Sequence, residues 1–290
     1  MTGTSLVISE SHVTDVGGLA VHRSLPRPGR RMVGAWCFLD RFGPIDVTPE
    51  RTMTVGPHPH IGLHTVTWLL QGEVLHSDSL GNQQPIRPGQ LNLMTGGPGI
   101  AHAEDARERS RALDGVQLWV AQPESTRHGP PSFAHHADLP HIDLPHGQAT
   151  ILVGEFAGSR SPAATDSPLV GVDIAGIGAL DVPLDPTFEY AVAVLHGSVR
   201  IENVHASPNE LVYLGTDRQG LALFLEEGSQ MLLLGGRPFP EEIVMWWNFV
   251  ARDRTELARA YQDWTDRTDR FRSVTTSLHR IAAPRPFWLE

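Results

Sequence analysis

The sequence contains no lysine, so all 23 of its basic residues are arginines. Pyridoxal enzymes need a lysine for their Schiff base and P-loop NTPases need one for phosphate binding, so both classes are excluded. A single cysteine, Cys37, excludes an intrachain disulfide and a cysteine-rich zinc site, and it indicates a reducing compartment. We expect Cys37, which lies between Trp36 and Phe38, to be a buried and unreactive thiol.

Long hydrophobic runs are also absent. No uncharged apolar segment approaches the ~20 residues that a membrane-spanning helix needs, and the first residues lack the pattern of a secretory leader. The net charge is −10 and no basic cluster occurs, which argues against direct binding of nucleic acid or of a membrane surface. We expect a cytoplasmic protein whose partners are small molecules or other proteins.

Glycine, proline and histidine are abundant, with 28, 23 and 15 residues. Between about residues 16 and 235, short apolar or alternating segments are separated by turn-forming residues, which predicts an all-β fold. Asp78 and Asn82, with Gly81 between them, are expected to form a hairpin turn. Apolar residues recur with a helical period only over 241–269, so we expect a C-terminal helix there, either continuous or broken once near Asp253. The clearest predicted strands are 63–70, 89–95, 114–122, 149–156, 189–197 and 230–236.

The two halves of the chain resemble each other. Each half has a strand that ends at glycine, a polar turn with proline, and another strand. The repeated segments are 69–74 with 87–94, and 194–199 with 207–214. Together with the length of 290 residues, this repeat predicts two β domains, at 1–125 and 149–290. We interpret 126–148, which is rich in proline and histidine, as a crossover along the surface.

Four residues of the first half have the spacing of metal ligands. His58 and His60 are two positions apart, as are His102 and Glu104, and on a strand such pairs project from one face. Three imidazoles and one carboxylate suit iron, manganese, nickel, copper or zinc, and leave two positions of an octahedral ion free. Isolated histidines are more often structural, but two matched pairs framed by Gly-Pro turns favour a metal site.

The spacing of His60 and His64 also suits a zinc pair on a helix. No glutamate follows His60, however, and Pro59, Gly62 and the β-branched residues beyond them argue against a helix. A helical metalloprotease site is therefore not expected.

Residues 58–104 closely resemble the signature of the pirin family, a branch of the cupin superfamily of small β-barrels. Segments 36–43, 115–120 and 235–250 are similar to further pirin segments in the same order. The resemblance, which is to pirins of bacterial type, implies a bicupin. Such a fold has two tandem jelly-roll barrels, or double-stranded β-helices, and a C-terminal α-helix.

The resemblance also implies that His58, His60, His102 and Glu104 are the ligands of one divalent ion. Fe(II) is the expected ion, with Zn, Ni, Cu, Mn or Co as alternatives. The general cupin pattern places a glutamate where this sequence has His64. Four roles stay open for His64. It could form a hydrogen bond to a metal ligand without binding the metal, carry a proton, act as an extra ligand, or be a structural histidine bonded to a neighbour.

The repeat places four other residues at the ligand positions of the second half. They are Pro183, Asp185, Ala222 and Phe224. Because no histidine is among them, we expect the second barrel to hold no metal and to support the first barrel.

Pirin-family proteins include quercetin 2,3-dioxygenases, so the resemblance implies a metal-dependent enzyme that cleaves a planar polyphenol with dioxygen. In such an enzyme Glu104 is both ligand and proton acceptor for the substrate hydroxyl, and Trp68 and Met94 line the pocket. Other pirins are redox-responsive regulators, so the alternative is a metal-dependent module that binds transcription factors or metabolic enzymes. A structural tetrahedral zinc is the third alternative.

Overall fold

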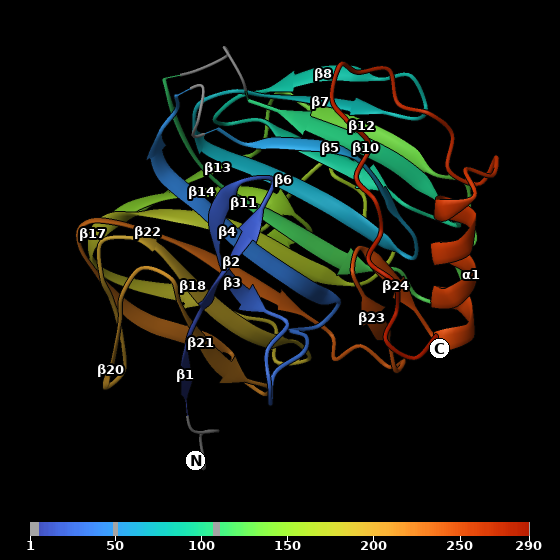
Figure 1. The fold of residues 1–290 in the computed structure, drawn as a ribbon. Coiled ribbons are helices and arrows are strands. Elements are labelled where there is room, and N and C mark those ends of the chain that lie inside the picture. Colours follow the sequence, from blue (N-terminus) through green and yellow to red (C-terminus); the bar gives the residue numbers. More distant parts are fainter. Residues whose placement is uncertain (1–5, 49–51, 107–110, 290) are drawn as a thin grey trace. The chain divides into compact units, whose positions relative to one another are not determined.

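The computed structural model describes residues 6–48, 52–106 and 111–289 (Figure 1). These residues form 24 strands and one helix, which confirms the expected all-β architecture with a single C-terminal helix. That helix, within the described part of the chain, is too short and too polar to cross a membrane. The chain divides into two compact units, which do not follow chain order: the first is 1–14, 22–41 and 138–239, and the second is 15–21, 42–137 and 240–290.

The first unit contains a nine-stranded antiparallel sheet. Its core is filled by aliphatic side chains such as Ile151, Val172, Val192 and Leu233, all fully buried. The main path of the sheet runs through β1 (Val7–Glu10), β21 (Glu210–Gly215), β18 (Glu189–His196), β22 (Gly220–Gly236), β17 (Leu169–Pro183), β14 (Gly147–Val153) and β13 (His141–Leu144). The short strands are β19 (Val199–Ile201) and β20 (Val204–Ala206), and a separate hairpin of β15 (Glu155–Phe156) and β16 (Ser159–Arg160).

The second unit is built on two sheets that share a core. The four-stranded sheet has the order β5 (Thr54–His60), β10 (Ile100–Asp105), β7 (Val74–Asp78) and β8 (Gln83–Ile86). The seven-stranded sheet has the order β12 (Ser132–His136), β9 (Leu91–Thr95), β6 (Leu63–Gln71), β11 (Ala112–Ala121), β4 (Trp36–Asp46), β3 (Leu19–Leu25) and β2 (His12–Val16). The division between the units falls within β2, β3 and β4. Val55, Leu69, Val74 and Ile86, which come from both sheets, pack in one apolar cluster.

The internal repeat predicted from the sequence appears in the strand pairing. In the first copy β6 pairs with β9 and β11, and in the second copy β18 pairs with β21 and β22, all antiparallel. Gly72 follows β6 and Gly197 follows β18, with φ angles of 94° and 66°. Residues with a side chain rarely adopt such angles, so both copies need glycine at the same point of the turn.

The C-terminal helix is shorter than the sequence predicted. Only Arg254–Thr265 form helix α1, and a hairpin of β23 (Val244–Trp246) and β24 (Phe249–Ala251) precedes it. Trp247, in the turn of this hairpin, has a φ of 51°, which cannot continue a helix. The apolar residues that suggested one long helix instead lie in the hairpin segment and in the helix. Trp247, Leu257 and Trp264 pack in one cluster with Phe271.

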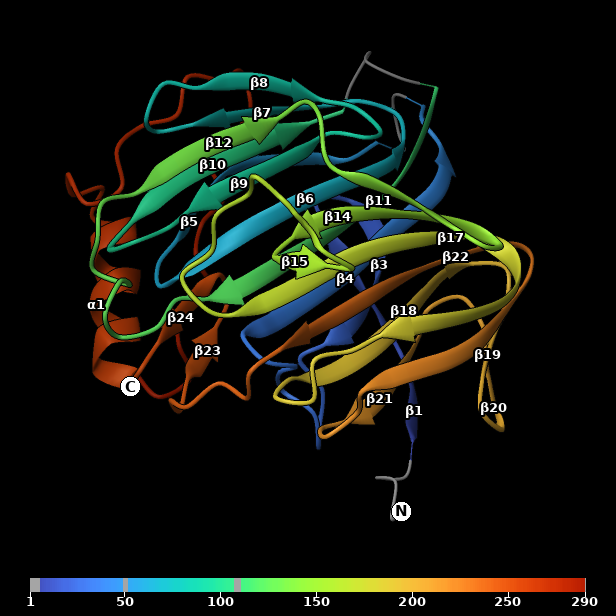
Figure 2. The ribbon, with the colours of Figure 1, turned by 180° about the vertical axis from the view of Figure 1, so that it is seen from behind.

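The proline- and histidine-rich crossover is not only a surface loop, and the prediction was wrong on this point. Its residues 132–136 form β12, which pairs with β9 so that Phe133 lies opposite Met94. Figure 2 shows β12 and β9 side by side. The segment therefore adds a strand to the unit that carries the predicted ligands.

Candidate metal centre

Strands β5 and β10 bring the three predicted histidine ligands together. Pro57 and Pro59 alternate with His58 and His60, and β5 accepts these prolines because it is the edge strand of its sheet. His102 on β10 lies opposite His58. The three imidazoles are buried, and each offers a nitrogen within 4.8 Å of the other two. In residues 6–48, 52–106 and 111–289 this is the single group of three or more such donors.

Hydrogen bonds to backbone carbonyls set the tautomers of two of these histidines. His58 donates from Nδ1 to the carbonyl of Gly56 at 2.9 Å, and His60 donates from Nδ1 to the carbonyl of Asn248 at 3.1 Å. The lone pairs are therefore assigned to Nε2. Nε2 of His60 lies 3.1 Å from Nε2 of His102. This distance suits a hydrogen bond when Nε2 of His102 carries the proton. When both nitrogens carry lone pairs, a cation bound between them removes their repulsion, so the donor set fits a metal ion.

Burial keeps the three imidazoles neutral. It lowers the pKa of His58 to about 4, against the opposing hydrogen bond to Gly56 and with a smaller lowering from nearby His76. Burial, with the neighbouring imidazoles, also holds the pKa of His60 and of His102 well below the ordinary value. Neutral imidazole is the form that binds a metal, so no proton has to leave before binding at neutral pH.

The fourth predicted ligand, Glu104, is buried on the same strand but stands outside the group of three donors. The pairing of β10 with β5 shifts register between His102 and Glu104, so that Glu104 lies opposite Val55. Burial raises the pKa of Glu104 to about 7, and a hydrogen bond with Thr67 opposes this rise. The role of Glu104 as a ligand stays a prediction.

Strand β6 places His64 and Trp68 away from the ligands. Thr67 faces Glu104, and alternation along the strand puts His64 and Trp68 on the opposite face. Nδ1 of His64 and the hydroxyl of Thr95 are hydrogen-bonded at 3.0 Å. Trp68 has the strand parity opposite to that of Thr67, and its role as a lining residue stays a prediction.

Other side chains lie on the same face of the seven-stranded sheet as Thr67, the face directed toward the three histidines. Met94 lies opposite Thr65 and so shares the face of Thr67, as the sequence suggested for a lining residue. Trp119 also lies opposite Thr65 and so shares this face. Its ring meets the imidazole of His60 edge to face, with 5.2 Å between the ring centroids.

The acceptor for His60 comes from the C-terminal segment, which sequence reasoning missed. Val250 donates a backbone hydrogen bond to the carbonyl of Ile61 at 3.1 Å, and this bond holds Asn248 beside His60. Gly62 permits the approach, because a side chain there would place its Cβ 2.2 Å from the carbonyl oxygen of Val250. No sequence signal marks Asn248, since it contributes only a backbone carbonyl.

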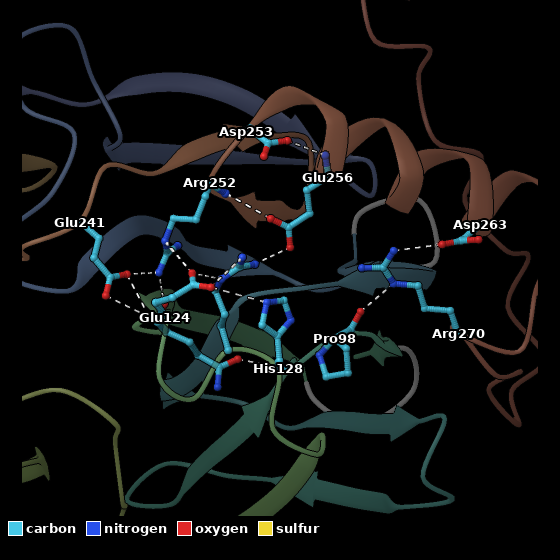
Figure 3. Close-up of polar contacts among 12 residues, drawn as sticks. Pro98, Glu124, His128, Glu241, Arg252, Asp253, Glu256, Asp263 and Arg270 are labelled. Carbon is cyan, nitrogen blue, oxygen red and sulfur yellow. Dashed lines mark hydrogen bonds and ion pairs between the residues drawn. The ribbon is translucent and has the colours of Figure 1, made fainter.

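Ion pairs fix this C-terminal segment to the chain that follows β11 (Figure 3). Arg252 forms an ion pair with Glu241 and donates to the carbonyl of Gln122 at 2.8 Å. The backbone N–H of Glu124 donates to both carboxylate oxygens of Glu241 at 3.0 Å. These contacts flank β23 and β24, so they position the turn that carries Asn248.

A further polar pair lies beside the ligands on β7. Asp78 accepts hydrogen bonds from the backbone N–H groups of Leu80 and Asn82, and Gly81 has a φ of 93°, so the predicted hairpin turn is confirmed. The turn prediction did not include His76, which contacts both Asp78 and His102. The signal was present, because His76 and Asp78 repeat the two-residue spacing of His58 and His60.

The four corresponding positions of the second repeat lie in or next to strands of the first unit. Pro183, Ala222 and Phe224 belong to β17 and β22. The carboxylate of Asp185 accepts hydrogen bonds from the backbone N–H and the hydroxyl of Thr187, at 2.8 and 2.7 Å. That this unit holds no metal stays a prediction.

Comparisons with known proteins cover both units. Residues 18–120 match the family model described as Pirin, and residues 170–271 match the Pirin C-terminal cupin domain. The chain is 48% identical over 275 residues, 94% of this chain and 87% of its relative, to a Pseudomonas aeruginosa protein provisionally named a quercetin 2,3-dioxygenase. It is 33% identical over 267 residues, 89% of this chain and 92% of the relative, to a pirin-like protein of Caulobacter vibrioides.

A solved structure gives the same result. A crystal structure titled quercetin 2,3-dioxygenase from Acinetobacter baumannii superposes with a TM-score of 0.94 at 38% sequence identity. The match covers 98% of this chain and 97% of the other. The predicted arrangement of two cupin domains and a C-terminal helix is thus confirmed.

Proposed function

Because this chain belongs to the pirin family of cupin proteins, we propose that it is a metal-dependent dioxygenase that opens the ring of a flavonol such as quercetin. The observation that carries the proposal is the convergence of three neutral imidazoles whose Nδ1 atoms are already engaged. Relatives named for quercetin 2,3-dioxygenase activity support the choice of substrate class.

His58, His60 and His102 would hold the ion through Nε2, with Glu104 as the fourth ligand. A divalent ion such as Fe(II), when bound, supplies coordination of the vicinal substrate oxygens and an electron-transfer partner for dioxygen. The carboxylate of Glu104 would accept the proton of the substrate hydroxyl at one of its oxygens. Trp119 and Met94 give this side of the site apolar surface suited to a planar aromatic ring.

The proposal is tested by joining metal analysis to an oxygen-consumption assay. Metal-free protein is loaded anaerobically with Fe(II), and loss of quercetin and of dioxygen is then followed after admission of air. We expect turnover in the iron-loaded protein, and its loss together with loss of bound iron in His60→Ala. His141→Ala is the matched control, because His141 bonds to Thr150 in the other unit.

Two outcomes would contradict the enzymatic proposal. Equal quercetin loss by metal-free protein would show that the cluster has no part in the reaction. Iron binding without quercetin loss would favour the regulatory alternative, in which the metal controls binding of a protein partner.

A further inference from the structure

A second pair of polar residues lies on the inner face of β7, next to the proposed ligands. In the pairing of β7 with β10, Asp78 lies opposite His102 and His76 lies opposite Glu104. Both side chains are buried, with 2% and 3% of Asp78 and His76 exposed. Neither belongs to the group of three donors. A buried carboxylate and an imidazole at this place need an explanation beyond packing, because burying polar groups costs free energy.

The two residues form a continuous chain of contacts that ends on His102. Nε2 of His76 lies 3.1 Å from a carboxylate oxygen of Asp78, and Nδ1 of His76 lies 3.4 Å from Nδ1 of His102. The side-chain amide of Asn82 donates to the same oxygen of Asp78 at 2.8 Å. Phe133 stacks on the imidazole of His76, with 4.3 Å between centroids and 12° between the planes. The ring of His76 is therefore fixed in both position and plane.

The proton positions along this chain follow from its acceptor end. An ionised Asp78 only accepts, so Nε2 of His76 carries a proton and donates it to Asp78. With its ring proton at Nε2, His76 bears a lone pair on Nδ1, which can accept from the N–H at Nδ1 of His102. This leaves the lone pair of His102 on Nε2, which points toward Nε2 of His60.

We propose that His76 and Asp78 are positioning residues that orient His102 and increase its donor strength toward the metal. The inference rests on the proposed metal site. Partners of this kind fix the tautomer and ring orientation of a histidine ligand, and their loss typically weakens metal binding about 10- to 100-fold.

The three histidines are not equivalent in this respect. His58 and His60 donate to neutral backbone carbonyls, whereas His102 is connected through His76 to a full negative charge. A charge that reaches the metal through one ligand stabilises the more oxidised ion. We therefore expect Asp78 to lower the Fe(III)/Fe(II) reduction potential of the loaded protein.

Asp78→Asn is the main test, because it removes the charge and keeps an oxygen for the backbone N–H groups of the turn. We expect it to weaken Co²⁺ binding about 10-fold by titration calorimetry, to shift the visible bands of the Co²⁺ protein, and to raise the reduction potential of the iron-loaded protein. His76→Phe should have larger effects, since it keeps an aromatic ring against Phe133 but has no acceptor for His102. His76→Gln, whose amide oxygen can accept, should recover part of the loss.

Asp173→Asn is the matched control. Asp173 is also buried and accepts from a side-chain amide, that of Gln230 at 2.9 and 2.8 Å, but it lies in the other unit. If Asp78→Asn and Asp173→Asn have the same Co²⁺ affinity, spectrum and potential as the unmodified protein, the inference is overturned. Failure of the unmodified protein to bind Co²⁺ or iron would instead contradict the proposed function. If His76→Phe does not fold, Asp78→Asn decides the question by itself.

Discussion

Replacing Glu104 by glutamine should change how the stability of the metal-free protein depends on pH. Burial raises the pKa of Glu104 from 4.5 to about 7, against the opposing hydrogen bond with Thr67. The folded state therefore binds the proton more tightly than the unfolded state does. The stability contributed by the protonated carboxyl is complete below pH 4.5 and is lost as the pH rises to about 7. The loss amounts to roughly 3 kcal/mol in the free energy of unfolding.

The assay is a set of urea titrations of metal-free protein between pH 5 and pH 8, for Glu104→Gln and for the unmodified chain. Glutamine does not titrate, so the variant should gain about 2 to 3 kcal/mol relative to the unmodified protein across this range. Buried histidines titrate equally in both proteins, so the difference isolates Glu104. Added Ni²⁺ should stabilise the unmodified protein more than the variant at pH 8, since a cation pairs with the carboxylate. Parallel pH profiles of the two metal-free proteins would refute the raised pKa, and equal stabilisation of both by Ni²⁺ would refute the role of Glu104 near the cation.

Three further predictions concern stability and metal binding. Metal-free protein should lose stability as the pH falls from 6.5 to about 4, because burial lowers the pKa of His58 in the folded state. His58 alone should account for roughly 3 kcal/mol of this loss. In urea titrations, His58→Phe should therefore show a flatter dependence of stability on pH over this range. Gly62→Ala should weaken Ni²⁺ binding in calorimetry, because its Cβ would displace the carbonyl of Val250 and with it Asn248. Trp264→Ala should lower the free energy of unfolding by about 3 to 5 kcal/mol, since the indole is 1% exposed in the C-terminal aromatic cluster.

The cluster of three histidines could be predicted because strand parity is a local property. His58 and His60 lie on one strand, and the two-residue period holds along it. The same parity did not extend to His64, because Gly62 has a φ of 66° in the turn between β5 and β6, and these strands belong to different sheets. A parity argument therefore ends at the first turn. The face on which Trp68 lies likewise depends on the sheet that contains β6, which a local pattern does not give.

The extent of the C-terminal helix could not be read from apolar periodicity. A hairpin with Trp246 and Phe249 and a helix with Leu257 can bury the same kinds of residue in one cluster. The period of 3.6 does not distinguish these cases over such short segments. The turn at Trp247 has a positive φ without glycine, so the usual turn signal was missing.

The hydrogen bond from His60 to Asn248 also has a consequence for the order of events during synthesis. The two residues are 188 positions apart, so the ribosome must release most of the second repeat before the acceptor of His60 emerges. A nascent chain that has exposed β5 to β11 carries the three histidines, but the ring of His60 still lacks this contact. The hydrogen bond that orients His60 can therefore form only after Asn248 has left the ribosome, later than the pairing of β5 to β11 requires.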